Sequence, residues 1–240
     1  MKLITVDNYE EMSALCAEIV RNTVKSNPYA TLGLATGSTV LGTYARLCKM
    51  FRDGQLSFKQ IKTVNLDEYV GLDGDNVQSY AYFMRTNLFN QVDINIANTF
   101  IPSGVAHNLD AECKRYDDLL TRMPRELQLL GLGSDGHIAF NEPGSSFESR
   151  TRVVKLEEST LRDNSRLFES LEDVPKRAIT MGIADIMSAK QLLLLASGLS
   201  KAQAVKAMVQ GEVSVNCPAS ILQRHSNAVV IVDKLAASLL

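Results

Sequence analysis

The sequence predicts an α/β fold: a three-layer α/β/α, Rossmann-like domain with a mainly parallel sheet and a helical lid segment. Strand-like and helix-like segments alternate along the chain, and this alternation is the pattern of βαβ units. Apolar runs such as Leu192–Leu195 and Val229–Val232 suit strands that are covered on both faces. A length of 240 residues favours one large α/β domain over two small ones, so we expect a single domain over 1–240.

Short apolar runs mark the expected strands, and longer segments with apolar residues at helical spacing mark the expected helices. In the first part of the chain, strands and helices alternate at 3–6, 9–25, 31–35, 40–51, 61–66 and 79–89. A short apolar stretch at 99–101 and a helix at 109–121 lead to a strand at 126–132. The last part predicts strands at 178–181, 191–196 and 228–232, with a helix at 201–209 between the last two.

The segment 155–177 is the most polar part of the chain. Its charged and amide side chains are Glu157, Glu158, Arg162, Asp163, Asn164, Arg166, Glu169, Glu172 and Asp173. Such a segment is either a solvated surface helix or a mobile lid over a nearby site. The pattern by itself leaves both interpretations open.

Composition narrows the class of protein. A hydrophobic content of 45% and a charged content of 22% are typical of a soluble globular chain, and the net charge of −2 argues against a nucleic-acid partner. The first residues do not resemble a signal peptide, and no apolar stretch reaches the length of a membrane span. We therefore expect no membrane partner. The four cysteines are widely spaced and form no C-x-x-C pair, so we also expect no metal site and a reducing, cytoplasmic location.

The run Leu130-Gly-Leu-Gly-Ser-Asp-Gly-His-Ile-Ala-Phe-Asn-Glu-Pro143 is the most informative part of the sequence. It places Asp135, His137 and Glu142 within eight residues, directly after a strand candidate. Ligands of open α/β sheets bind at the carboxyl ends of strands, and two carboxylates with an imidazole are suited to acid–base chemistry. The alternative is that Asp135 caps a turn and His137 belongs to the core; the cluster favours the acid–base interpretation.

Leu34-Ala-Thr-Gly-Ser-Thr39 follows a strand and opens a helix. Gly37 permits a tight turn, and Ser38 and Thr39 can cap the helix and donate hydroxyl hydrogen bonds. Backbone N–H groups at a helix start favour an anion, most often a phosphate. The run lacks the Lys-Ser/Thr ending of a nucleotide P-loop, and a simple strand-to-helix turn remains the alternative.

Two further strand ends carry charged side chains. Asp67 and Glu68 follow a predicted strand, where a partly desolvated carboxylate can act as a base on carbon; a capping role is the alternative, more so for Glu68. Lys201 lies near a predicted helix start, where the helix dipole disfavours a cation unless the cation shares a bound anion. Arg166 in the polar segment is a second candidate for that anion.

Taken together, these motifs resemble the glucosamine-6-phosphate deaminase family from end to end. The matching runs are Leu-Ala-Thr-Gly-Ser-Thr at 34–39, Asn-Leu-Asp-Glu-Tyr-Val-Gly-Leu at 65–72, Gly-Ser-Asp-Gly-His-Ile-Ala-Phe-Asn-Glu-Pro at 133–143, Asn-Ser-Arg at 164–166 and Gly-Leu-Ser-Lys-Ala at 198–202. The resemblance implies conversion of glucosamine 6-phosphate and water into fructose 6-phosphate and ammonia, with no metal or organic cofactor. Aldose–ketose proton transfer needs a base and an acid but no redox centre, which agrees with these residue types.

The resemblance also implies the role of each candidate residue. It makes Asp67 the base that moves a proton between C2 and C1 of the opened sugar. It makes His137 the group that handles the ring-oxygen proton, flanked and oriented by Asp135 and Glu142. The sugar phosphate is the expected small-molecule partner, held by Gly37, Ser38, Thr39, Arg166 and Lys201. Under this reading the segment 155–177 becomes a lid.

The chain departs from the longer, allosteric members of the family at two places. Those members are hexamers activated by N-acetylglucosamine 6-phosphate, and they extend further at the C-terminus than Leu240. Where they carry a lysine after Arg152-Val153, this chain has Val154. We therefore expect a monomer or small homo-oligomer without this activation. Two other functions compete with the deaminase: a 6-phosphogluconolactonase of the same fold, and a sugar-phosphate sensor without turnover.

Overall fold

A seven-stranded parallel sheet forms the centre of the protein. The structure is a computed structural model that describes residues 1–165, 168, 170 and 173–240. The strand order is β1-β10-β9-β6-β2-β3-β5, and every neighbouring pair is parallel. The strands are β1 (Lys2–Val6), β2 (Thr31–Leu34), β3 (Lys62–Asn65), β5 (Thr99–Phe100), β6 (Leu127–Gly131), β9 (Leu192–Ala196) and β10 (Ala228–Asp233). The predicted α/β class with a mainly parallel sheet is confirmed.

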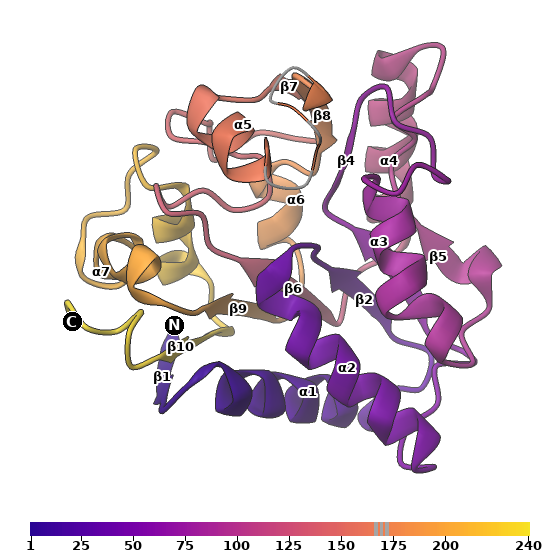
Figure 1. Ribbon diagram of the computed structural model, residues 1–240, viewed down its shortest axis with the longest axis horizontal. Coiled ribbons are helices and arrows are strands. Elements are labelled where there is room, and N and C mark those ends of the chain that lie inside the picture. Colours follow the sequence, from indigo (N-terminus) through magenta and orange to yellow (C-terminus); the bar gives the residue numbers. More distant parts are fainter. Residues whose placement is uncertain (166–167, 169, 171–172) are drawn as a thin grey trace.

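Helices flank this sheet along most of its width (Figure 1). They are α1 (Tyr9–Ser26), α2 (Ser38–Arg52), α3 (Tyr80–Asn87), α4 (Leu109–Arg122), α5 (Glu158–Ser165), α6 (Ile183–Met187) and α7 (Ala202–Gln210). Short 3₁₀ helices occur at Phe89–Gln91, Ile96–Asn98, Leu199–Lys201 and Pro218–Arg224. None of the helices in the described part of the chain combines the length and the apolar character of a membrane span.

A second, antiparallel sheet of three strands was not predicted. It has the order β4-β8-β7 and consists of β4 (Asp67–Tyr69), β8 (Arg177–Thr180) and β7 (Arg152–Lys155). The strand expected at 178–181 belongs to this sheet, so its assumed place in the βαβ alternation is wrong. The strands β4 and β7 are three and four residues long, which is too short for a clear apolar period. Figure 1 shows β7 and β8 beside α5, away from the central strands.

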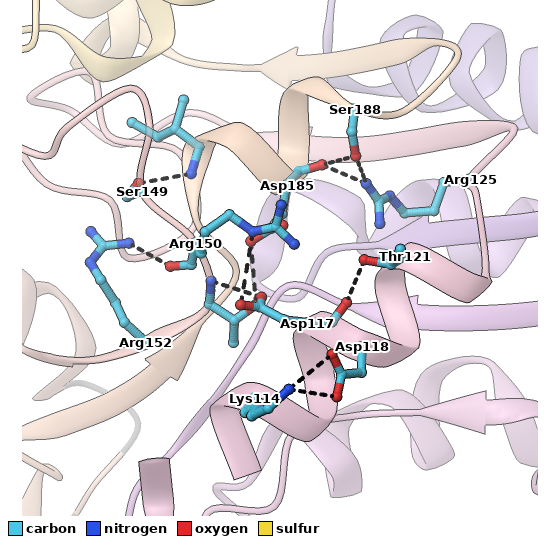
Figure 2. A network of polar contacts seen from close by, with 12 residues as sticks. Lys114, Asp117, Asp118, Thr121, Arg125, Ser149, Arg150, Arg152, Asp185 and Ser188 are labelled. Atoms are coloured by element: carbon cyan, nitrogen blue, oxygen red, sulfur yellow. Dashed lines mark hydrogen bonds and ion pairs between the residues drawn. The ribbon is translucent and has the colours of Figure 1, made fainter. Parts of the chain in front are cut away.

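A polar network anchors the segment that leads into β7. Figure 2 shows Arg150 between Asp117 of α4 and Asp185 of α6, and its Nε atom lies 2.8 Å from the Asp185 carboxylate. Arg125, which precedes β6, donates to the Asp185 carbonyl and to the Ser188 hydroxyl. Burial, and then the Asp117 carboxylate, raise the pKa of Asp185 to about 6 against the opposing effect of the two arginines. The network therefore ties the small sheet to the central one.

The two sheets have separate apolar cores. The large core packs around the parallel strands, whereas Tyr69, Phe140, Leu156 and Ala178 form a small apolar cluster at the antiparallel sheet. The rings of Tyr69 and Phe140 lie 5.8 Å apart, centroid to centroid. Since Phe140 directly follows the His137 segment and Tyr69 closes β4, this small cluster holds two pieces of the candidate site together.

Candidate active site

A cavity of about 200 Å³ opens at the carboxyl ends of β2, β3 and β6. This is the edge at which open α/β sheets bind ligands. The residues around it come from six chain segments, and they include most of the predicted site. The lining residues are Ala35, Thr36, Gly37, Ser38, Thr39, Leu66, Asp67, Tyr80, Gly131, Leu132, Gly133, His137, Ala139, Phe140, Thr160 and Lys201.

The turn from β2 to α2 lines one end of the cavity. Gly37 is the N-cap of α2 with a φ of 97°, a left-handed conformation that favours glycine. No side chain caps this helix, so the expectation that Ser38 or Thr39 does so is wrong; Ser38 is already the first helical residue. The first N–H groups of a helix have no intrahelical partner, and here they belong to residues that line the cavity. The turn is therefore suited to an anion.

The turn from β9 to α7 brings Lys201 to the same end of the cavity. The Asp233 carboxylate accepts hydrogen bonds from the Gly198 N–H, at 3.1 Å, and from the Ser197 hydroxyl, at 2.5 Å. These bonds fix the start of the 3₁₀ turn Leu199–Lys201, and α7 begins one residue later than its predicted start at 201. A cation therefore stands beside the anion-binding turn. Arg166, the other predicted phosphate ligand, lies outside the described residues.

Asp67 is the first residue of β4 and forms part of the cavity wall. Its side chain is only 6% exposed. Burial, and then the neighbouring Glu68 carboxylate, raise the pKa of Asp67 from 3.8 to about 8. The ionised form of a carboxyl group with this pKa is a stronger base than an ordinary aspartate.

His137 projects into the cavity and is held by Asp135. The Asp135 Oδ1 atom lies 2.7 Å from His137 Nδ1 and also accepts the His137 backbone N–H at 3.1 Å. Partial burial raises the pKa of Asp135, but the hydrogen bond and charge of His137 outweigh it and bring the pKa down to about 2. An ionised Asp135 therefore engages Nδ1 and leaves Nε2 as the ring nitrogen for a substrate.

The backbone of this loop is shaped around the imidazole ring. A Cβ atom on Gly133 would stand 2.3 Å from the ring of His137, so any larger residue would displace it. The Gly133 N–H donates to the His137 carbonyl at 2.9 Å and closes the loop. Ala139 has a φ of 52°, a conformation that non-glycine residues adopt at a cost and that is enriched at functional sites.

Glu142 lies one step behind the cavity wall and is 8% exposed. Its carboxylate accepts the Thr160 hydroxyl at 2.5 Å and the Glu157 N–H at 3.1 Å. These contacts run to the start of α5, and the expected flanking of His137 by Glu142 stays a prediction. Thr160 itself lines the cavity. Glu142 therefore ties the polar segment to the site.

Sequence reasoning missed Tyr80, Thr160 and Phe140 as parts of the cavity wall. Phe140 lies inside the recognised motif, but nothing in its spacing marks it. Tyr80 and Thr160 come from helices α3 and α5, and no turn or strand end identifies them. Within the described residues, no three His, Cys, Asp or Glu side chains gather as the ligands of a metal ion would.

A family model matches most of the chain. Residues 6–231 match the family described as glucosamine-6-phosphate isomerases/6-phosphogluconolactonase. The chain belongs to this family. The expected resemblance is confirmed.

Two relatives of known name align with the full length of this chain. A glucosamine-6-phosphate deaminase of Clostridium perfringens strain 13 is 49% identical over 100% of both chains. Glucosamine-6-phosphate deaminase 1 of Bacillus subtilis strain 168 is 48% identical over 100% of this chain and 99% of its own.

Solved structures of enzymes with these two names superpose on the protein. A structure described as a monomeric glucosamine-6-phosphate deaminase superposes with a TM-score of 0.99 at 48% identity, covering 100% of both chains. The 6-phosphogluconolactonase of Trypanosoma brucei reaches a TM-score of 0.80 at 22% identity, over 100% of this chain and 98% of its own. That second likeness shows a shared fold.

Proposed function

We propose how this pocket carries out the reaction of a glucosamine-6-phosphate deaminase, which converts glucosamine 6-phosphate and water into fructose 6-phosphate and ammonia. The chain is an enzyme of this kind by its full-length identity of 48–49% with relatives that carry that name. One observation supports the roles that we assign to the residues of the cavity. A buried carboxyl group with a pKa near 8, an imidazole and an anion-binding turn share one small cavity.

The phosphate is bound by the two strand-to-helix turns. Gly37, Ser38 and Thr39 supply backbone N–H groups and hydroxyls, and Lys201 supplies the positive charge. Arg166 keeps its proposed part in this set on the strength of the family motif. Fixing the phosphate at this end directs the sugar ring towards Asp67 and His137, which line the rest of the cavity.

His137 opens the sugar ring. Ring opening moves the proton of the C1 hydroxyl to the ring oxygen, and the His137 imidazole, held by an ionised Asp135, can take that proton and return it.

Asp67 then removes the proton from C2 and delivers it to C1. The C2–N bond becomes an imine, which water hydrolyses to the ketone of fructose 6-phosphate with release of ammonia. Each proton that leaves one atom of the sugar returns to another, so the isomerisation needs no external oxidant or reductant.

The segment 155–177 acts as the lid of this single domain. Support comes from Thr160, which lines the cavity from α5 while its hydroxyl reaches Glu142. Because Glu142 accepts both the Glu157 N–H and this hydroxyl, it fixes the start of α5 over the sugar. A closed α5 excludes water from the open-chain intermediate.

The decisive assay follows both products. Incubation with glucosamine 6-phosphate is expected to release ammonia and fructose 6-phosphate in equal amounts, and 6-phosphogluconolactone is expected to be hydrolysed no faster than without protein. Lactone hydrolysis without ammonia release would establish the lactonase instead. Binding of the amino sugar without either product would establish the sensor.

The protein acts as a monomer in the cytoplasm, without effector control. A monomeric deaminase of 48% identity superposes over the whole chain. Val154 packs against the small apolar cluster of the antiparallel sheet, and a valine there cannot pair with an effector phosphate. Three of the four free cysteines are buried, which suits a reducing compartment.

A further inference from the structure

Glu68 is a buried carboxylate to which the proposed chemistry gives no part. It follows Asp67 in β4, and consecutive residues of a strand point to opposite faces. Asp67 therefore faces the cavity, while Glu68 faces away from it and is 2% exposed. A carboxyl group this deeply buried is costly unless its oxygens are well satisfied.

Three backbone N–H groups converge on Glu68. Its Oε1 atom accepts the N–H of Tyr69 at 2.8 Å and that of Tyr80 at 2.9 Å, and its Oε2 atom accepts the N–H of Ala81 at 2.9 Å. Tyr80 and Ala81 are the first two residues of α3, whose opening N–H groups lack intrahelical partners. Burial raises the pKa of Glu68, and these three hydrogen bonds oppose that rise. All three donors stabilise the ionised form.

The same hydrogen bonds place Tyr80 at the cavity. Its ring lies 4.8 Å from that of Tyr69 and 6.1 Å from that of Phe140, and its hydroxyl donates to the Tyr69 hydroxyl at 3.2 Å. Tyr80 lines the cavity together with Asp67. Its position depends on the start of α3, which Glu68 fixes to β4.

We propose that Glu68 is a positioning residue for the reaction: it fastens α3 to β4 so that Tyr80 walls the cavity, and it places a fixed negative charge directly behind Asp67. The inference rests on the proposed role of Asp67 as the carbon base. The proposed role of Glu68 does not require contact with the sugar.

The negative charge of Glu68 raises the pKa of Asp67, its neighbour in β4. Among the groups that face Asp67, Tyr80 of α3 and Tyr116 of α4 are neutral near pH 7, because burial raises the pKa of both hydroxyls. His137 and Lys201 are the other ionisable side chains that line the cavity. Burial is the larger cause of the raised pKa of Asp67, and the negative charge of Glu68 raises it further. Without that charge Asp67 would be a weaker base.

The test is Glu68→Gln, which keeps the shape and an acceptor oxygen but removes the charge. We expect the acid limb of the kcat/KM profile to move to lower pH by about one unit. On the plateau above that limb we expect kcat to fall about 3-fold, because the ionised form of a base of lower pKa removes the C2 proton more slowly. KM is expected to change little, since the phosphate turns are untouched. An unshifted acid limb in a folded variant would overturn the inference.

Two matched variants accompany it. Asp73→Asn removes a carboxylate that also accepts backbone N–H groups, those of Asp75 and Asn76, but lies on an exposed loop; its profile is expected to match the native one. Glu68→Asp keeps the charge on a shorter side chain that reaches the α3 amides poorly. Its acid limb is expected to stay in place while kcat falls, and it decides the matter if Glu68→Gln does not fold. An acid limb that moves in Glu68→Asp, or native kcat there, would contradict the inference.

Failure of the two proposals is distinguishable. If Asp67→Asn turns over normally, Asp67 is not the base and the assigned mechanism fails. If Asp67→Asn is inactive but Glu68→Gln behaves as the native enzyme, the mechanism stands and only the role of Glu68 is lost.

Discussion

The two ends of the cavity are built in different ways. At the phosphate end, Gly37–Thr39 and Lys201 lie in turns that follow strands of the central sheet, and the groups offered to an anion are backbone N–H groups, hydroxyls and one lysine. At the acid–base end, Asp67, His137 and Glu142 depend on single side-chain partners, and two of those partners belong to the small sheet or to α5. Substitution of one side chain is therefore expected to weaken substrate binding at the phosphate end and to remove a chemical group at the acid–base end.

The difference follows from what each end has to do. Binding an anion requires converging N–H groups and one cation. The first turn of a helix provides such N–H groups whatever its side chains are. A base and an acid need pKa values that differ from the ordinary ones, and only burial and neighbouring charges can shift them. We expect substitutions at the acid–base end to lower kcat and those at the phosphate end to raise KM.

Asp67→Asn should have the largest effect. We expect turnover to fall by about 1,000-fold or more with little change in apparent affinity, because the amide keeps the shape of the carbon base but cannot accept the proton. Rates of ammonia release at saturating substrate check this. Near-native ammonia release would remove Asp67 from its role.

The same variant also changes the pH dependence of stability. Since the pKa of Asp67 rises from 3.8 to about 8 on folding, the folded protein holds a proton that the unfolded chain releases in this range. Stability is therefore lost as pH rises from 3.8 towards 8. Asp67→Asn removes that loss, so at pH 9 its free energy of unfolding should exceed the native value by up to about 6 kcal/mol, with no gain near pH 4. Urea unfolding at the two pH values measures it.

His137→Gln ranks second. Loss of the ring-opening group should lower turnover of the cyclic sugar by about 100-fold or more. A 4,5-dideoxy analogue of the substrate lacks both hydroxyls that could close a ring, so its turnover should fall much less. Equal losses on the two substrates would place His137 in a later step.

Lys201→Ala tests the phosphate end. One charge-assisted phosphate contact contributes about 1.5–3 kcal/mol, so KM should rise by about 10- to 100-fold while kcat changes little. Lys206→Ala on the exposed face of α7 is the matched control and should behave as the native enzyme. A fall in kcat without a rise in KM would show that Lys201 belongs functionally to the acid–base end.

Thr160→Val tests the link between α5 and Glu142. It deletes the 2.5 Å hydrogen bond to a buried carboxylate with little change of volume, and kcat/KM should fall about 10-fold. Thr160→Ser keeps the hydroxyl and should restore most of the activity. Equal losses in both variants would mean that packing of the methyl group, and not the hydrogen bond, positions α5.

The smallest expected effect is that of N-acetylglucosamine 6-phosphate. With Val154 in place of a cation, the rate curve should be hyperbolic and unchanged by this sugar, and light scattering should report a monomer. A hexameric mass, or a sigmoidal curve that the sugar straightens, would overturn the proposal and leave the deaminase activity unaffected.

The sequence predicted the site well where local structure alone defines it. The strand-to-helix turn at Gly37, the glycine loop around His137 and the strand end at Asp67 each follow an apolar run, and parallel strands bring such ends to one edge. The second sheet escaped prediction because β4 and β7 pair with β8, which lies far along the chain. Pairing between strands that are distant in the sequence leaves no pattern in the residues of either strand.

The alternation of the central strands with helices, the parallel sheet and the identity of the chemical groups were thus determined by the sequence alone, because apolar periodicity and turn residues act over a few neighbouring positions. The tertiary structure decided the strength of the base and the partners of each acid. Burial and Glu68 raise the pKa of Asp67 to about 8, and the Glu142 carboxylate accepts a hydrogen bond from Thr160 of α5. Both depend on desolvation and on contacts between distant segments, and these exist only once the chain has folded.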